Sequence, residues 1–245
     1  RWPTRSRGRK RGWGEWGGVA GEEGGVYCTD MRNGSNSLLV AIREALEIGE
    51  IGDVPVHIYH LKAAGQENWP LMADALALID SARTAGRDVT ADIYPYIRTG
   101  IGLTSFLHPR HYARGADVFL STLGDSELRA ELRREVETTS DWENWYRHVG
   151  MDWDNVLIVS APEGVAPRVV NRSVTAAAEA PRTDPCTAFF ALVPSGGVSV
   201  HPHSLNEEQK HQALRAASVT SANDAPPVHP ETTDSSHARA LPASP

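Results

Sequence analysis

The feature that most constrains this chain is an alternation of short apolar runs with amphipathic segments between residues 26 and 93. Apolar runs at 26–31, 54–60 and 88–93 have the length of buried strands. The two segments between them, 37–50 and 70–82, carry apolar residues at helical spacing. Strand, helix, strand, helix and strand in this order predict βαβ units and a parallel sheet. The sequence therefore predicts an α/β fold.

Local signals place the ends of the two helices. Ser37 has the residue type that caps a helix N-terminus, and we expect it to cap the first helix. Pro70 is typical of the opening of a helix, and Gly86 is typical of the residue that ends one. These signals agree with the periodicity and strengthen the prediction of a strand and helix alternation.

The rest of the chain is less regular and contains no internal repeat. Ser204 and Glu207 have the spacing of a capping box, which predicts a helix that ends near residue 216. The other expected elements are a helix at 125–136, a short strand at 155–159, one or two helices within 173–193 and a last strand at 218–223.

Composition excludes several classes of protein. Hydrophobic residues make up 40% and charged residues 22% of the 245 residues, as in ordinary globular proteins. The formal net charge of −7 argues against a general nucleic-acid binder. The only cysteines, Cys28 and Cys186, have no CxxC spacing, so we expect a reduced, cytoplasmic protein. No apolar run approaches the roughly 20 residues that span a bilayer, so no membrane partner is expected.

Residues 1–25 differ from the rest of the chain. They are rich in Arg at the start and in Gly and Trp afterwards, without helical or strand periodicity. We expect a disordered tail at 1–25 and one domain at 26–245. The alternative is an RNA-binding arm in which Trp2, Trp13 and Trp16 stack on bases, and the acidic remainder of the chain argues against it.

Three polar residues stand at the ends of predicted strands: Asp30, His60 and Asp224. In a (β/α) barrel the carboxyl ends of the strands meet at the active site. Carboxylate and imidazole are the usual ligands of a hydrolytic divalent metal, which acidifies bound water and polarises a carbonyl. The alternative is structural, because Asp after a strand often forms a turn and a single His often serves only as a hydrogen-bonding group.

Other polar residues are open to two interpretations. Lys62, two residues after His60, is either a solvated loop lysine or a ligand for substrate. Tyr94 lies in the run DIYPY, where it can bind a carboxylate or oxyanion or simply pack. His201, His203 and His211 fall in a Pro/Ser loop and a helix start, which makes them poor candidates for metal ligands.

Four stretches, in the correct order from Gly24 to about Leu241, resemble the N-acyl-D-amino-acid deacylase (D-aminoacylase) family of the amidohydrolase superfamily. GGVYCTDMRNG is similar to the family's GGxYxTHMRNE, and VPVHIYHLKAAGQENW is similar to VPVQISHLKAAG. DVTADIYPY is similar to DVTxDxYPY. SANDAPPVHP, followed by HARAL, is similar to GSDxxxxxP…HPRxxG.

This resemblance implies a TIM-like barrel, of which the chain supplies roughly strands five to eight. It implies hydrolysis of the amide bond of N-acyl-D-amino acids, or of a related non-peptide C–N bond, by a zinc-activated water. His60 matches the zinc ligand of the sixth strand, and Asp224 matches the aspartate of the eighth, which binds metal and acts as general base and acid. Lys62, Tyr94 and Arg239 match the positions that hold the substrate's carboxylate and carbonyl.

The departures from the family pattern concern the metal. Asp30 stands where the family has a histidine ligand on the fifth strand. Aspartate is shorter than imidazole and favours harder metals. The family's HxH pair has no counterpart upstream of Asp30, and its bridging cysteine is missing. We therefore expect zinc binding to be weak or absent and the chain to be weak or inactive alone.

One further expectation follows from a partial barrel. Its end strands, at 26–31 and 218–223, are exposed edges that favour self-association.

The alternative functions are a non-catalytic fragment that retains a carboxylate-binding pocket and, among enzymes, a cyclic amidase of the hydantoinase or dihydroorotase kind. The latter uses a carboxylated lysine, and no lysine lies at the strand that would supply it.

Overall fold

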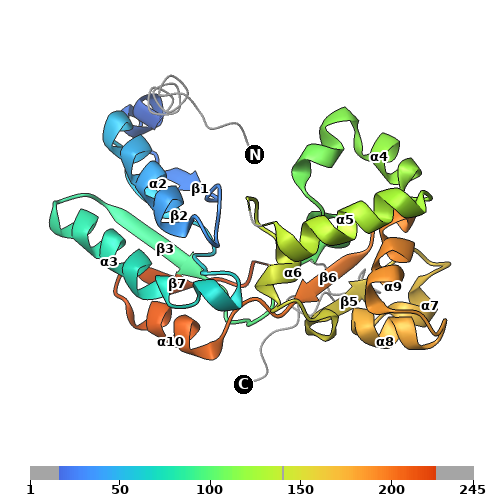
Figure 1. The fold of residues 1–245 in the computed structure, drawn as a ribbon. Coiled ribbons are helices and arrows are strands. Elements are labelled where there is room, and N and C mark those ends of the chain that lie inside the picture. The colour runs from blue at the N-terminus through green and yellow to red at the C-terminus, as the bar shows by residue number, and fades with distance from the viewer. Residues whose placement is uncertain (1–16, 140, 225–245) are drawn as a thin grey trace, which may run out of the picture. The chain divides into compact units, whose positions relative to one another are not determined.

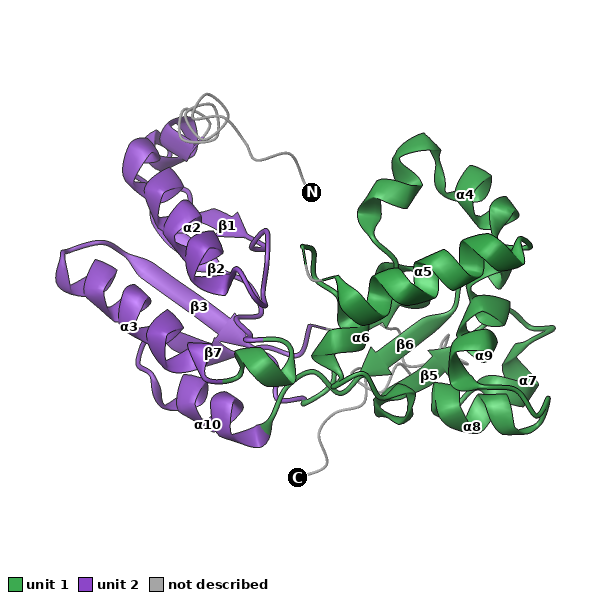
Figure 2. Cartoon of the chain, viewed as in Figure 1, with its two compact units in different colours: residues 1–4, 64–69, 97–206 green, residues 5–63, 70–96, 207–245 purple. Residues whose placement is uncertain are grey.

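The computed structural model describes residues 17–139 and 141–224, and contacts divide the chain into two compact units (Figure 2). The described part of the parallel-sheet unit covers residues 17–63, 70–96 and 207–224. The antiparallel-sheet unit covers 64–69 and 97–206, apart from residue 140. Within the domain expected at 26–245, residues 97–206 form a hydrophobic core of their own.

The parallel-sheet unit contains the strands that the sequence predicts. They are β1 (Tyr27–Thr29), β2 (Val56–Ile58), β3 (Val89–Ile93) and β7 (Val219–Ser221), in the order β1-β2-β3-β7. All three pairs are parallel, with Cys28 opposite His57, His57 opposite Thr90, and Asp92 opposite Thr220. The predicted α/β class and parallel sheet are confirmed, and β1 and β7 stand at the two ends of the order.

Three helices pack against this sheet: α2 (Leu38–Gly52), α3 (Leu71–Thr84) and α10 (Glu207–Arg215) (Figure 1). Ile42, Ile79 and Ala213 from the helices join Val56 and Ile58 from β2 in one buried cluster. Side chains alternate along a strand, so His57 lies on the opposite face of the sheet. Thr90 and Asp92, whose side chains contact His57, are therefore also on the face that the helices do not cover.

The helix ends agree only in part with the expected signals. Ser37 precedes α2, but its side chain makes no cap, and the Asn33 carboxamide oxygen accepts the Ser35 and Ser37 N–H groups at 2.9 Å instead. Pro70 precedes α3, and Gly86 follows it with φ +88°, as expected. The Ser204 hydroxyl lies 2.7 Å from that of Thr99, and α10 begins only at Glu207, so the capping box predicts the helix but not its start.

The expected tail is described only from residue 17. Residues 17–22 are helical, which differs from the absence of regular structure expected there. Residues 1–16, with the three tryptophans of the alternative RNA-binding arm, lie outside the described residues. Within the described part of the chain, no helix has the length and apolar character needed to cross a membrane.

The antiparallel-sheet unit has strands β4 (Ile101–Gly102), β5 (Val156–Ser160) and β6 (Ser199–Pro202), in the order β4-β6-β5. Phe106, Trp153 and Phe189 stack in its core, with centroids of adjacent rings 4.8 and 5.4 Å apart. Its α-helices are α4 (Ala116–Thr122), α5 (Ser126–Thr138), α6 (Trp145–His148), α7 (Ala166–Val169), α8 (Val174–Glu179) and α9 (Pro185–Leu192). Short 3₁₀ turns cover Gln66–Asn68, Leu103–Phe106, Pro109–Arg114, Trp153–Asn155 and Val193–Ser195.

Candidate functional site

The site begins where the β2 ladder ends. Tyr59 still donates its N–H to the Thr29 carbonyl at 3.0 Å, as a ladder residue does. His60 follows with φ +37°, in the left-handed region that residues other than glycine rarely adopt. The turn directs the chain out of the sheet at the carboxyl end of β2, which is the edge where active sites of parallel sheets lie.

Asp30 lies beside His60, because β1 and β2 are adjacent parallel strands and both residues follow their strands. Asp30 Oδ1 is 3.4 Å from His60 Nε2. This separation is longer than an ordinary hydrogen bond. Two ligands bound at about 2.1 Å in a tetrahedral zinc site lie about 3.4 Å apart. The pair therefore has the spacing of two corners of such a site.

Lys62 contacts the other ring nitrogen of His60. Its Nζ lies 2.8 Å from His60 Nδ1 and 3.4 Å from the His60 carbonyl oxygen. An ammonium only donates, so Nδ1 accepts and the ring proton of a neutral imidazole sits on Nε2, toward Asp30. Nε2 can bind a metal only in the other tautomer, in which the ring proton sits on Nδ1 and the contact with the Lys62 ammonium is lost.

The third expected ligand does not join this pair. Asp224 follows β7, is exposed, and has φ +49°. Among residues 17–139 and 141–224, no set of three His, Cys, Asp or Glu side chains lies close enough to hold a metal ion. The described residues therefore bring together two side chains of a type that can bind zinc, and this donor set fits the metal only in part.

The remaining candidates are placed as follows. Tyr94 is buried, at 2% exposure, with its ring centroid 6.4 Å from that of His60 and 6.1 Å from that of Tyr96. Arg239 lies outside the described residues. His201 is in strand β6 rather than in a loop, and His211 is exposed on α10. Tyr94 is thus the one substrate-binding candidate besides Lys62 that the structure places next to His60.

Sequence reasoning missed a polar group on the uncovered sheet face. His57 Nε2 lies 2.9 Å from Asp92 Oδ2, and His57 Nδ1 lies 2.8 Å from the Thr90 hydroxyl. Asp92 Oδ1 also accepts the His60 N–H at 2.8 Å. The available signal was the presence of His and Asp inside otherwise apolar strands, where an unpaired polar group is costly.

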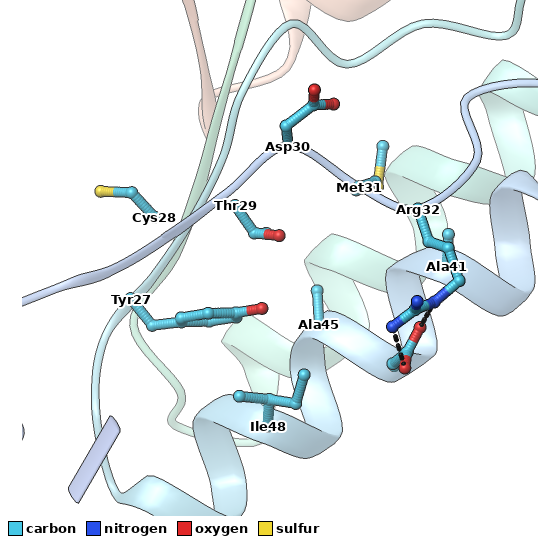
Figure 3. A pocket seen from close by; sticks show the side chains of 10 residues that line it. Tyr27, Cys28, Thr29, Asp30, Met31, Arg32, Ala41, Ala45 and Ile48 are labelled. Atoms are coloured by element: carbon cyan, nitrogen blue, oxygen red, sulfur yellow. Dashed lines mark hydrogen bonds and ion pairs between the residues drawn. The ribbon is translucent and has the colours of Figure 1, made fainter. Parts of the chain in front are cut away.

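A cavity of about 280 Å³ opens between β1 and α2 (Figure 3). Its lining comes from residues 27–32 and from Ala41, Glu44, Ala45 and Ile48 of α2. Arg32 and Glu44 make a bidentate ion pair across it, with both N–O distances 2.7 Å. This ion pair satisfies the charges of Arg32 and Glu44, and the remaining charged side chain of the lining is Asp30, the candidate ligand beside His60.

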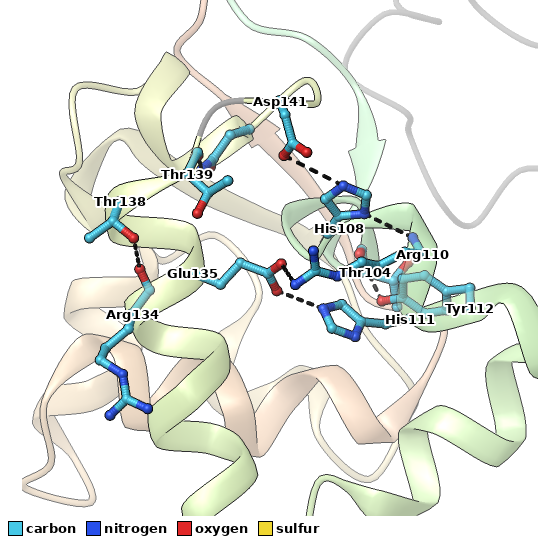
Figure 4. A network of polar contacts seen from close by, with 11 residues as sticks. Thr104, His108, Arg110, His111, Tyr112, Arg134, Glu135, Thr138, Thr139 and Asp141 are labelled. Atoms are coloured by element: carbon cyan, nitrogen blue, oxygen red, sulfur yellow. Dashed lines mark hydrogen bonds and ion pairs between the residues drawn. The ribbon is translucent and has the colours of Figure 1, made fainter. Parts of the chain in front are cut away.

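The antiparallel-sheet unit holds a second polar cluster (Figure 4). The buried Glu135 carboxylate pairs with Arg110 and with His111, whose Nε2 lies 2.6 Å from Glu135 Oε2. His108 lies 3.6 Å from Asp141, and burial lowers the pKa of its imidazole. An arginine and a histidine contact a buried carboxylate here, an arrangement that joins α5 to the turn at Pro109–Arg114.

Comparison with known proteins is informative for a short part of the chain. No protein-family model matches it. It is 42% identical over 74 residues to D-aminoacylase and 37% identical over 78 residues to N-acyl-D-glutamate deacylase, both from Alcaligenes xylosoxydans xylosoxydans. These stretches are 30% and 32% of this chain, and only 15% and 16% of the relatives.

The fold is shared with a solved structure over most of the chain. N-acyl-D-glutamate deacylase from Bordetella bronchiseptica, in complex with zinc and a phosphonate inhibitor that mimics the tetrahedral intermediate, superimposes with a TM-score of 0.61 at 20% identity. The match covers 88% of this chain and 35% of that protein. The chain therefore spans about a third of the length of this structural relative.

Proposed function

This chain resembles part of the D-aminoacylases, and we propose that it is the portion of such an enzyme that carries ligands for the metal and the substrate. In this proposal β1, β2, β3 and β7 are strands five to eight of a TIM-like barrel. The reaction is the metal-dependent hydrolysis of the amide bond of an N-acyl-D-amino acid, and zinc is the proposed metal.

One observation carries the proposal. Asp30, His60 and Lys62 come together at the carboxyl ends of two adjacent parallel strands, with 3.4 Å between Asp30 and His60 and 2.8 Å between His60 and Lys62. This group joins a carboxylate, an imidazole and an ammonium, which are suited to a metal and to an anionic substrate. The sequence similarity to D-aminoacylase also supports hydrolysis of an N-acyl-D-amino acid as the reaction.

Each residue has a proposed role. Asp30 and His60 would hold the metal, and Asp224, which the structure does not bring into a cluster with them, would complete the ligand set. A bound zinc would acidify water and polarise the amide carbonyl. Lys62 and Arg239 would bind the substrate carboxylate, because both present cationic N–H donors. Tyr94, next to His60, would donate its hydroxyl to the carbonyl oxygen. Asp224 would take a proton from water and return it to the leaving amine.

We propose that the chain alone is a weak zinc binder with activity near background. Only Asp30 and His60 meet as ligands among the described residues, and a zinc site with two protein ligands is weak. Asp30 is also 74% exposed, so solvent screens its attraction for a cation. A second candidate function, a carboxylate-binding module without catalysis, is favoured by this same absence of a third described ligand.

The two candidates are separated by binding and turnover measurements on the full chain. N-acetyl-D-methionine and its L-enantiomer are titrated calorimetrically with and without zinc, and hydrolysis is followed under the same conditions. Lys62→Met is compared with Arg43→Met, which removes an exposed cation from α2 of the same unit.

We expect binding of the D-enantiomer that weakens in Lys62→Met and is unchanged in Arg43→Met. Zinc-dependent binding supports the hydrolase, and zinc-independent binding without turnover supports the carboxylate-binding module. Equal binding by the wild type and Lys62→Met contradicts both. Rapid, chelator-sensitive turnover contradicts the claim that the chain is weak alone.

A further inference from the structure

Asp92, on β3, contacts the turn that contains His60 through both its side chain and its backbone. Its Oδ1 accepts the His60 N–H at 2.8 Å. Its backbone carbonyl accepts the next amide, that of Leu61, at 2.7 Å. One residue of β3 therefore binds two successive amides of the chain as it leaves β2.

These two bonds explain the unusual backbone of His60. In a regular ladder, successive amides alternate between the two neighbouring strands. Here Tyr59 donates toward β1 at Thr29, whereas His60 and Leu61 both donate to Asp92. Two successive amides that donate to one residue need a local turn, and His60 makes it with φ +37°. Such a conformation persists in a residue other than glycine only when its surroundings hold it.

His57 in turn holds the Asp92 carboxylate. Its Nε2 lies 2.9 Å from Asp92 Oδ2, and its Nδ1 lies 2.8 Å from the Thr90 hydroxyl. The Asp92 side chain is 12% exposed, so water competes little for its oxygens. Thr90, His57 and Asp92 form a continuous chain of hydrogen bonds that ends on the His60 amide.

We propose that Asp92 is a positioning residue, which holds His60 in the conformation that turns its imidazole toward Asp30 and Lys62. The importance of this for zinc rests on the function proposed above. The positioning itself is a property of the turn and stands on the hydrogen bonds alone.

Amide hydrogen exchange of the full chain tests the positioning. We compare the wild type with Asp92→Ala, which removes the acceptor, and with Asp92→Asn, which keeps an oxygen that can accept the His60 N–H. The control is Asp88→Asn, which makes the same chemical change at the exposed residue before β3. His57→Leu, which removes only the ring that orients Asp92, serves as a second variant if Asp92→Ala fails to fold.

The expected result is a local effect. In Asp92→Ala the His60 amide exchanges about tenfold faster or more, while the Ala91 amide, bonded to Ser218 within the sheet, keeps its rate. Asp92→Asn retains most of the protection, and His57→Leu loses part of it. An unchanged His60 rate in Asp92→Ala overturns the proposal. A uniform increase at both amides also overturns it, because it shows a merely structural role.

A zinc titration with zinc alone, in competition with a chromophoric chelator, adds the functional readout. We expect weaker zinc binding in Asp92→Ala, recovery in Asp92→Asn, and no change in Asp88→Asn. If Asp92→Ala binds zinc as the wild type does, the positioning of His60 by Asp92 has no role in metal binding. If the wild type binds no zinc, the proposed function fails, and the exchange experiment still decides whether Asp92 positions His60.

Discussion

The buried imidazole of His148 should make the stability of this protein depend on pH. His148 ends α6 in the antiparallel-sheet unit, is 2% exposed, and has no hydrogen-bond partner at either ring nitrogen. Its ring lies edge-on to Trp145, with centroids 5.3 Å apart. Burial, and to a lesser extent the charge of Arg147, lowers the pKa of His148 to about 4.

The sign and size of the effect follow from this pKa. An unfolded histidine has a pKa of about 6.5, so between pH 6.5 and 4 the unfolded chain binds more protons than the folded one. Stability is therefore complete above about pH 6.5 and falls as the pH drops toward 4. With these two pKa values, the free energy of unfolding decreases by about 2 kcal/mol between pH 7.5 and pH 5.

Urea unfolding followed by tryptophan fluorescence measures this loss at both pH values. His148→Leu removes the titrating group and fills its site with an apolar side chain. His211→Leu is the control, because His211 is 60% exposed on α10. We expect the wild type and His211→Leu to lose about 2 kcal/mol more than His148→Leu on acidification. The same loss in all three proteins would refute the assignment to His148.

Three further predictions concern stability and can be measured by thermal or urea unfolding. Glu135→Gln removes the charge that pairs with Arg110 and His111 and should cost about 1–3 kcal/mol, whereas Glu131→Gln, on the exposed side of α5, should be neutral. Gly49→Ala would place a Cβ 2.2 Å from Val56 Cγ2 and should cost about 1–3 kcal/mol, whereas Gly124→Ala, in open space, should be tolerated. Asp184→Ala removes the acceptor of the Cys186 and Thr187 amides at the start of α9 and should cost about 1 kcal/mol. The arguments are contradicted if Glu131→Gln destabilises the protein as much as Glu135→Gln, or Gly124→Ala as much as Gly49→Ala. An Asp184→Ala variant as stable as the wild type contradicts the capping role of Asp184.

Local patterns predicted the parallel-sheet unit well, because its signals are short-range. The apolar runs at 26–31, 54–60, 88–93 and 218–223 contain all four strands, and Gly86 marks the end of α3 with a positive φ. The order β1-β2-β3 also followed, since parallel strands joined by one helix lie side by side, whereas residues 97–206 separate β3 from β7 in the sequence. The carboxyl ends of β1 and β2 then had to meet, which is why Asp30 and His60 could be paired from the sequence.

The missed features depend on contacts between distant segments. Strand β6 has four residues and includes Pro202, so its own sequence hardly indicates a strand, and its pairing with β4 and β5 defines it. Asp92 begins the run DIYPY, and its bonds to His57 and His60 cross from β3 to β2, so the local sequence does not indicate them. The left-handed conformation of His60 likewise results from these bonds rather than from a local glycine.

The pairing of Asp30 with His60 as metal ligands is tested most directly by the imidazole resonances of the full chain during a zinc titration. Nitrogen-15 correlation spectra of the histidine rings resolve Nε2 of His60 from the other ring nitrogens. We expect zinc to shift the His60 Nε2 resonance first, and Asp30→Asn to require about tenfold more zinc for the same shift. A His60 resonance that does not respond to zinc, or one that responds equally in Asp30→Asn, would contradict the metal site on which this account depends.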